Sequence, residues 1–276
     1  MSAPLGRRLC EVTENRASGG YRVFSLRDRE GGLPEAGQFY MLAAESRWEQ
    51  RGGRPFLPRA LSVADAEQAS GGVRLDFLLE GVGPGTERLC ALEVGEGVWV
   101  NGPLGNAFSE PREVAARAAG AILVGGGIGV APLALLRRRF AARGVPTQIL
   151  LGFRDRAHSG GLDDLFSNCQ LGLASDDGHL GERGYVTDLL AAMLEGDDAT
   201  SAAVYSCGPP AMLEAVRAMC AARGVSCELA LESPMACGFG ACFSCVTKVK
   251  QDDGSWDYRR VCVEGPVFPA RQLVFE

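Results

Sequence analysis

The sequence predicts a multi-domain α+β protein with an N-terminal antiparallel β-barrel, an α/β domain built on a parallel sheet, and a small C-terminal module. In residues 1–108, short β-branched and aromatic runs alternate with Gly- and Pro-bearing turns, as in small barrels. In residues 109–226, apolar strands alternate with amphipathic helices, which is typical of βαβ units. In residues 227–276, cysteines lie close together. These three ranges are the predicted domains.

Each of the first two domains has recognisable elements. The strands expected in the barrel are 21–26, 38–42, 73–79 and 97–100. The α/β domain is expected to have strands at 121–124, 147–152 and 202–205 and helices at 133–143 and 211–223. The carboxyl ends of parallel strands share one edge of a sheet, so ligands are expected there.

Composition excludes some classes of function. The net charge is −6, and no basic run is interleaved with aromatic residues, so no nucleic-acid partner is expected. Residues 118–136 are uncharged and long enough to span a membrane. However, the segment contains five glycines, at 120, 125, 126, 127 and 129, and a proline at 132, so a strand, a glycine turn and a helix start are favoured instead. Residues 1–8 lack the apolar core of a signal peptide, so we expect a cytoplasmic protein without a membrane partner.

Four cysteines have the spacing of iron–sulfur ligands. Cys237, Cys242, Cys245 and Cys262 follow the pattern of plant-type [2Fe–2S] clusters. Glycines within 237–242 permit the tight loop that brings thiolates together. A zinc site normally has two paired Cys/His elements, and only one Cys-x2-Cys is present. A Cys245–Cys262 disulfide would leave the other two cysteines unexplained. We therefore predict a [2Fe–2S] cluster.

A hairpin provides a second argument for the fourth ligand. Asp253-Gly254 is typical of a two-residue turn. Such a turn pairs residue 252 with 255 and places Cys245 directly opposite Cys262, so the two are expected to bind the same iron. The same register pairs 246 with 261 and 250 with 257, but it also places Lys248 opposite Arg259, which is unfavourable. Phe239 and Phe243 are interpreted as local core, with a docking surface as the alternative.

Phosphate-binding groups are expected near the barrel. Arg59 offers a fork of donors for a pyrophosphate, and Ser62 adds a hydroxyl. Thr86 is predicted to cap a helix over 87–92, which would present the backbone N–H groups of Gly85 and Thr86 to a phosphate. The alternatives are a solvated surface Arg and an ordinary helix start.

Two segments of the α/β domain are expected to bind a nucleotide. Gly125, Gly126, Gly127 and Gly129 follow a strand and allow close approach of a cofactor, although they do not form a strict dinucleotide fingerprint. Cys207-Gly208-Pro209 follows another strand at the same edge of the sheet. His158 and His179 lie in polar stretches and are expected at the surface rather than in catalysis.

Taken together, these segments resemble the electron-transfer subunits of NAD-dependent dihydroorotate dehydrogenase B, within the ferredoxin-reductase-like flavoproteins. The segments that carry the resemblance are 36–40, 59–62, 102–106, 125–132, 207–210, 235–245 and 261–268, in family order along nearly the whole chain. Residue 60 departs from the family, which usually has Pro where this chain has Ala60.

The resemblance implies cofactors and roles. FAD is expected on Arg59, Ala60, Leu61 and Ser62, with Leu78, Leu79 and Glu80 bordering the flavin and Gly85 and Thr86 holding phosphate. NAD is expected as the electron acceptor, and no residue is expected to act as an acid–base catalyst. The implied partner is an FMN-containing dihydroorotate dehydrogenase catalytic subunit in a heterotetramer, serving pyrimidine biosynthesis. The alternatives are a subunit of another NAD(P)H–ferredoxin or hydrogenase-type oxidoreductase, or a non-enzymatic iron–sulfur sensor.

Overall fold

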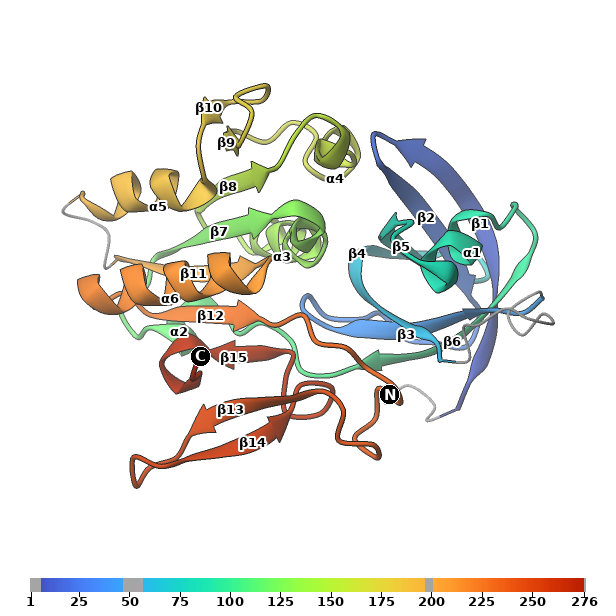
Figure 1. The fold of residues 1–276 in the computed structure, drawn as a ribbon. Helices are drawn as coiled ribbons and strands as arrows, with labels where there is room; N and C mark the ends of the chain where they lie inside the picture. The colour runs from blue at the N-terminus through green and yellow to red at the C-terminus, as the bar shows by residue number, and fades with distance from the viewer. Residues whose placement is uncertain (1–5, 47–56, 197–200, 276) are drawn as a thin grey trace.

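The structure is a computed structural model, which describes residues 6–46, 57–196 and 201–275. Six antiparallel strands close into a barrel in the order β1-β2-β5-β4-β3-β6, as Figure 1 shows at its right side. The strands are β1 (Arg8–Ser18), β2 (Tyr21–Asp28), β3 (Phe39–Ala44), β4 (Arg59–Ala69), β5 (Gly72–Glu80) and β6 (Gly97–Leu104), with α1 (Pro84–Cys90) after β5. The predicted barrel is confirmed.

The barrel has an apolar interior made by alternating residues. Along β5, Val73, Leu75 and Phe77 are buried, while the residues between them are partly exposed. This period of two is what a half-buried strand requires. Leu89 on α1 is also fully buried and belongs to the same core. The helix is thereby packed onto the barrel.

The second layer is a seven-stranded sheet in the order β10-β9-β8-β7-β11-β12-β15, parallel except for β15. Its strands are β7 (Gly120–Gly126), β8 (Thr147–Phe153), β9 (Leu171–Ser175), β10 (Glu182–Arg183), β11 (Ala202–Cys207), β12 (Cys227–Ala230) and β15 (Val267–Pro269). The helical segments are α2 (Pro111–Val114), η1 (Gly127–Gly129), α3 (Val130–Ala142), η2 (Ala157–Ser159), α4 (Leu162–Leu165), α5 (Val186–Leu194), α6 (Pro210–Arg223) and η4 (Ala270–Gln272).

Helices cover both faces of the sheet. Leu123 of β7 packs with α3, whereas its neighbour Val124 packs with α5 and α6 on the opposite face. Helix α3 also contacts β4 and so lies between the sheet and the barrel. The uncharged segment 118–136 therefore forms β7, η1 and the first part of α3, as predicted. Within the described residues, no helix is long and apolar enough to cross a membrane.

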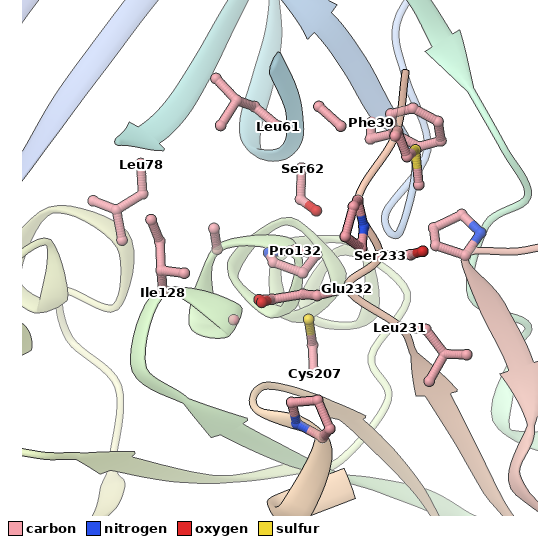
Figure 2. Close-up of a pocket in the computed structure, with 17 residues that line it drawn as sticks. Phe39, Leu61, Ser62, Leu78, Ile128, Pro132, Cys207, Leu231, Glu232 and Ser233 are labelled. Carbon is pink, nitrogen blue, oxygen red and sulfur yellow. The ribbon is translucent and has the colours of Figure 1, made fainter. Parts of the chain in front are cut away.

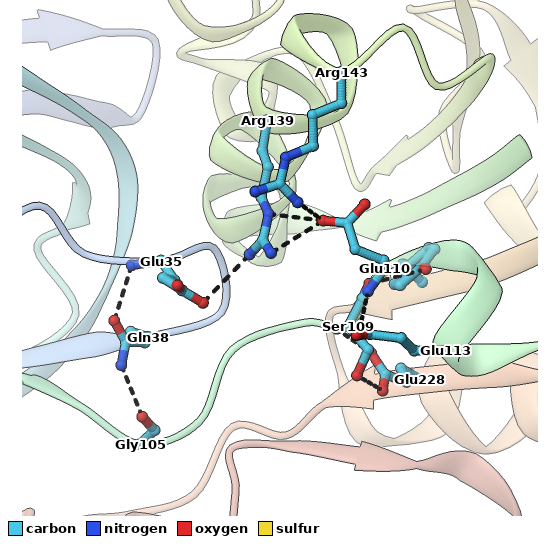
Figure 3. Close-up of polar contacts among 10 residues, drawn as sticks. Glu35, Gln38, Gly105, Ser109, Glu110, Glu113, Arg139, Arg143 and Glu228 are labelled. Atoms are coloured by element: carbon cyan, nitrogen blue, oxygen red, sulfur yellow. Dashed lines mark hydrogen bonds and ion pairs between the residues drawn. The ribbon is translucent and has the colours of Figure 1, made fainter.

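Ion pairs join the barrel to the sheet (Figure 3). Arg139 on α3 pairs with Glu110 at 3.0 Å and with Glu35 in the barrel at 3.4 Å. The hydroxyl of Ser109 donates to Glu228 on β12 at 2.7 Å. Burial raises the pKa of Glu228, and the two bonds from Ser109 oppose that rise. These contacts fix the position of the barrel relative to the sheet, and therefore the positions of the residues that line the cavity between them.

The C-terminal segment is joined to the sheet rather than detached from it. The predicted limit after residue 226 falls immediately before β12, which pairs with β11, and β15 then pairs with β12. Between these two strands the chain forms a long loop and the hairpin of β13 (Val246–Lys250) and β14 (Trp256–Arg260). The domain limits 1–108, 109–226 and 227–276 stay a prediction.

The two-residue turn predicted for this hairpin is wrong. Gln251 N–H donates to Ser255 O at 2.8 Å, and Gly254 N–H donates to Gln251 O at 3.1 Å, so the loop has one more residue. Gly254 adopts a φ of +83°, the left-handed conformation that closes such a loop with a bulge. Asp253-Gly254 therefore marks a turn of a different length.

The longer loop shifts every cross-strand pair by one residue. The observed pairs include Val246 with Arg260, Lys248 with Tyr258 and Lys250 with Trp256. The unfavourable facing of Lys248 and Arg259 is thereby avoided, and the Lys248 ammonium lies 4.4 Å from the Trp256 ring centroid. Cys245 does not face Cys262, but its carbonyl accepts from Val261 N–H at 2.7 Å. The two cysteines remain neighbours.

Candidate cofactor site

A cavity of about 460 Å³ lies between the barrel and the sheet (Figure 2). Its volume is in the range of small-molecule and cofactor sites. The barrel contributes Ala60, Leu61, Ser62 and Leu78, and the sheet and its following loops contribute Gly129 and Cys207. All six were predicted cofactor residues, from segments far apart in sequence. Leu79, also predicted, does not line this cavity, because its side chain is fully buried in the barrel core.

The predicted phosphate-binding residues also come together. The Arg59 guanidinium lies against Gly85, where a Cβ would be 2.4 Å from Arg59 Nε. Gly85 is the second residue of α1, so the guanidinium lies next to the first backbone N–H groups of that helix. The bond from Arg59 Nη1 to Leu57 O, 2.7 Å, helps to hold this orientation. The residues present fit the pyrophosphate of FAD.

The predicted helix cap is wrong, although the helix exists. Helix α1 begins at Pro84, three residues earlier than expected, and Thr86 is its third residue. The Thr86 hydroxyl donates to Gly83 O at 3.2 Å and accepts from Val82 N–H at 3.1 Å. Pro is favoured in the first turn of a helix because it lacks an N–H, and this outweighed the capping preference of Thr.

A second cavity, of about 660 Å³, opens at the carboxyl edge of the sheet. Gly126, Gly127 and Pro209 line it, and so does Glu80 from the end of β5. Gly125 and Gly208 lie beside it: a Cβ on Gly208 would be 3.1 Å from Gly126 N. A Cβ on Gly129 would be 2.6 Å from Cys207 O. The glycines therefore let the two predicted nucleotide segments pack against each other.

Glu232 was not predicted, yet it lines both cavities. Figure 2 shows its carboxyl between Ser62 and Cys207. Surrounding protein raises the pKa of Glu232, and complete burial raises that of Cys207 well above its usual value. A hydroxyl, a thiol and a carboxyl are thus available where the cavities meet. Glu232 directly follows Leu231 after β12, so the carboxyl-edge rule would have found it had that strand been recognised.

His158 was expected at the surface but lines the second cavity. Its Nδ1 is 2.7 Å from Asp155 Oδ1, and its Nε2 is 3.5 Å from Glu80 Oε1. Its ring also meets the Tyr21 ring edge to face, with centroids 6.1 Å apart. His158 therefore bridges the loop after β8 to the barrel. Its surroundings come from three separate segments, which no local pattern reveals.

Three of the four cysteines, Cys237, Cys242 and Cys245, lie in the loop before β13, and Cys262 lies in the turn after β14. Cys237 and Cys242 lie close to each other, and so do Cys245 and Cys262. Within the residues the structure describes, no three His, Cys, Asp or Glu side chains are grouped for a single metal ion. The thiols form two pairs instead, and Cys245 and Cys262 are buried whereas Cys242 is exposed.

The loop has the backbone that a cluster requires. Gly238 and Gly240 adopt φ of +79° and +88°. A Cβ at Gly238 would lie 2.5 Å from Met41 Cγ, and one at Gly240 would lie 2.7 Å from Val263 Cγ2. Both conformation and space therefore favour glycine. A hydrogen bond with Ser244 lowers the pKa of Cys242 to about 6, while burial raises that of Cys262 to about 12.

The cysteine loop adjoins the wall of the first cavity. Gly238 packs against Met41 of β3. Met41 is the antiparallel pairing partner of Ala60 on the neighbouring strand β4, and Ala60 belongs to the cavity wall. Met235, two residues before Cys237, and Pro266, four after Cys262, line the cavity directly. A cluster bound by the four thiols would therefore be separated from the cavity by a thin layer of protein.

Comparison with known proteins finds relatives that are similar in sequence along most of the chain. Residues 232–274 match the iron–sulfur cluster binding domain of dihydroorotate dehydrogenase B. The chain is 34% identical over 249 residues to the dihydroorotate dehydrogenase B (NAD(+)) electron transfer subunit of Caldanaerobacter subterraneus subsp. tengcongensis, covering 89% of this chain and 90% of that one. The corresponding protein of Shouchella clausii is 39% identical over 224 residues, covering 79% and 80%.

The chain belongs to this family of electron-transfer subunits. Membership confirms the predicted family and the oxidoreductase class, and the match over residues 232–274 supports an iron–sulfur cluster in the C-terminal module.

Two solved structures confirm the fold class. The NADH-dependent reduced ferredoxin-NADP oxidoreductase has a TM-score of 0.78 at 24% identity, covering 98% of this chain and 91% of the other. Phthalate dioxygenase reductase has a TM-score of 0.63 at 21% identity, covering 94% of each chain. The ferredoxin-reductase-like fold is thus common to all three.

Proposed function

We propose that the chain passes electrons from a dihydroorotate-oxidising flavoprotein partner through its [2Fe–2S] cluster and FAD to NAD, in pyrimidine biosynthesis. The observation that carries the proposal is the continuous order of sites. The cysteine loop adjoins the first cavity, and Ile128 and Glu232 line both that cavity and the second. When bound, FAD links the single-electron chemistry of the cluster to the two-electron chemistry of NAD.

The proposed roles follow the positions of the residues. Arg59, Gly85 and Thr86 hold the FAD pyrophosphate, while Ala60, Leu61, Ser62 and Leu78 shape the flavin cavity. The glycines of 125–129 and the segment 207–209 admit NAD at the carboxyl edge of the sheet. Cys237, Cys242, Cys245 and Cys262 ligate the cluster, with the last two on one iron. Glu232 and Cys207, whose pKa values are raised by burial, lie in the wall of the flavin cavity.

The partner is proposed from the family. An FMN-containing catalytic subunit would oxidise dihydroorotate in a heterotetramer located in the cytoplasm. The decisive experiment is NAD-linked dihydroorotate oxidation by the purified chain with and without the candidate subunit. Activity that appears only with both would support the proposal. Dihydroorotate oxidation by the isolated chain, or failure to recover a second subunit on co-purification, would favour a stand-alone reductase of the same fold.

The docking surface is expected around the cysteine loop. Phe239 and Phe243 are 60% and 62% exposed, so their interpretation as local core is wrong. Trp256, Tyr258 and Val263 are exposed in the same module. Aromatic side chains are enriched at the centres of protein interfaces. Such a surface beside the cluster ligands suits a partner that delivers electrons there.

Replacing Phe239 with Ser should weaken binding of the catalytic subunit by about tenfold or more, because interface aromatic residues contribute roughly 1–2 kcal/mol or more each. NADH-to-dye activity through FAD should stay near wild type. Val94→Ser is the matched control, since Val94 is 66% exposed in the turn between α1 and β6, where the adjacent Gly95 N–H bonds to Val12 O of β1. Isothermal titration with the partner measures both. Equal affinity in the Phe239 and Val94 variants would place the interface elsewhere.

A further inference from the structure

Arg260 has a more specific setting than a surface arginine. It is the last residue of β14, two positions before Cys262. Its Nη2 is 2.8 Å from Glu264 Oε1, and its guanidinium lies 5.0 Å from the ring centroid of Phe243. Its Nη1 donates to Gly240 O at 3.2 Å. Three residues from two segments of the cysteine module therefore hold this one cation in a fixed place.

The position of the guanidinium relates it to the buried pair of thiols. Arg260 lies two residues before Cys262, and the intervening Val261 donates its N–H to Cys245 O at 2.7 Å. Gly240, whose carbonyl accepts from the guanidinium at 3.2 Å, lies between Cys237 and Cys242 in the cysteine loop. Gly240 is left-handed, with a φ of +88°, so this loop geometry is specific. Arg260 thus acts on the cysteine site in two ways, by its charge beside Cys262 and by fixing the loop that carries Cys237 and Cys242.

We propose that Arg260 is a positioning residue that raises the reduction potential of the [2Fe–2S] cluster. The inference rests on the proposed ligation by Cys245 and Cys262. Accepting an electron makes the cluster more negative, so a nearby positive charge stabilises the reduced form. Net charge and hydrogen bonds to sulfur are general determinants of cluster potential. Glu264 partly neutralises Arg260, so loss of that carboxylate has the opposite effect.

The test is a redox titration of the full chain, followed by the electron paramagnetic resonance signal of the reduced cluster, which separates the cluster from FAD. Arg260→Gln should lower the equilibrium constant for one-electron reduction of the cluster about tenfold, which shifts the midpoint potential by about 59 mV in the negative direction. Glu264→Gln should shift the midpoint in the positive direction. Arg260→Lys, which keeps the charge but not the planar fork, should lie between wild type and Arg260→Gln.

Arg259→Gln is the matched control, because it removes the same charge from the neighbouring position. Its guanidinium pairs with Asp257 at 2.7 Å and with Gln251 at 3.0 Å instead of with the cysteine loop. Its midpoint should stay near wild type. Equal midpoints in wild type, Arg260→Gln and Glu264→Gln, with normal iron content, would overturn the proposal. If Arg260→Gln loses iron, the opposite shifts of Arg260→Lys and Glu264→Gln decide it. A wild-type chain without any cluster signal would instead contradict the proposed function.

Discussion

Replacement of Cys242 by Ala is expected to reduce the iron and acid-labile sulfide content of the purified chain to near zero. A [2Fe–2S] cluster needs four thiolates, and three leave one iron open to solvent and to loss. Cys242 is exposed, so its removal leaves no cavity in the core that would unfold the protein. Colorimetric iron and sulfide assays, together with the visible absorption of the cluster, measure the effect directly.

The matched control is Cys169→Ser, which changes a partly exposed thiol of the α/β domain that donates to the nearby Ser167 carbonyl at 3.6 Å. It should retain full iron content. FAD content and NADH-to-dye activity should persist in Cys242→Ala, because Cys242 lines neither the first nor the second cavity. Wild-type iron in Cys242→Ala would refute this ligand set. Zinc in place of iron and sulfide in the wild-type chain would favour the structural-metal alternative.

The fold was predictable wherever burial imposes a period on the sequence. The strands predicted at 73–79 and 121–124 correspond to β5 and β7 because one or both faces of each are buried. Strands β1 and β4 were not predicted as such. Their second halves are polar and exposed, because the barrel ends there extend into solvent. Propensity and periodicity carry little information for strands of that kind.

The site was predictable where a short motif determines its own geometry. The glycines at the end of β7 and in η1 are local and lie between a strand and a helix, as predicted. The cysteine loop is local too, and its four ligands stay a prediction. Glu232 and His158 owe their positions to strands and loops that meet only in the folded chain, so sequence patterns alone did not single them out. The hairpin failed for a different reason: Asp253-Gly254 suits turns of more than one length, and one residue changes the whole register.

Arg59→Ala is expected to weaken FAD binding by about 1.5–3 kcal/mol, the usual contribution of a hydrogen bond to a charged group. This corresponds to a loss of roughly tenfold to a hundredfold in affinity. The reason is geometric, since the guanidinium lies against Gly85 at the start of α1, next in sequence to Ala60 of the cavity wall, and the described lining of that cavity contains no Lys or Arg. Quenching of flavin fluorescence during titration of the apoprotein gives the dissociation constant.

Two further variants separate charge from position. Gly85→Ala keeps Arg59 but places a Cβ 2.4 Å from its Nε, so the guanidinium must move and FAD affinity should again fall. Arg29→Ala is the control. It removes an arginine just after β2 whose side chain is 68% exposed and whose Nη2 lies 3.6 Å from Glu11 Oε2, and FAD affinity should not change. Iron content should stay normal in all three, because the cysteine loop is not altered. An unchanged dissociation constant in Arg59→Ala would show that this arginine is a surface residue, and the pyrophosphate would then have to bind elsewhere on the barrel.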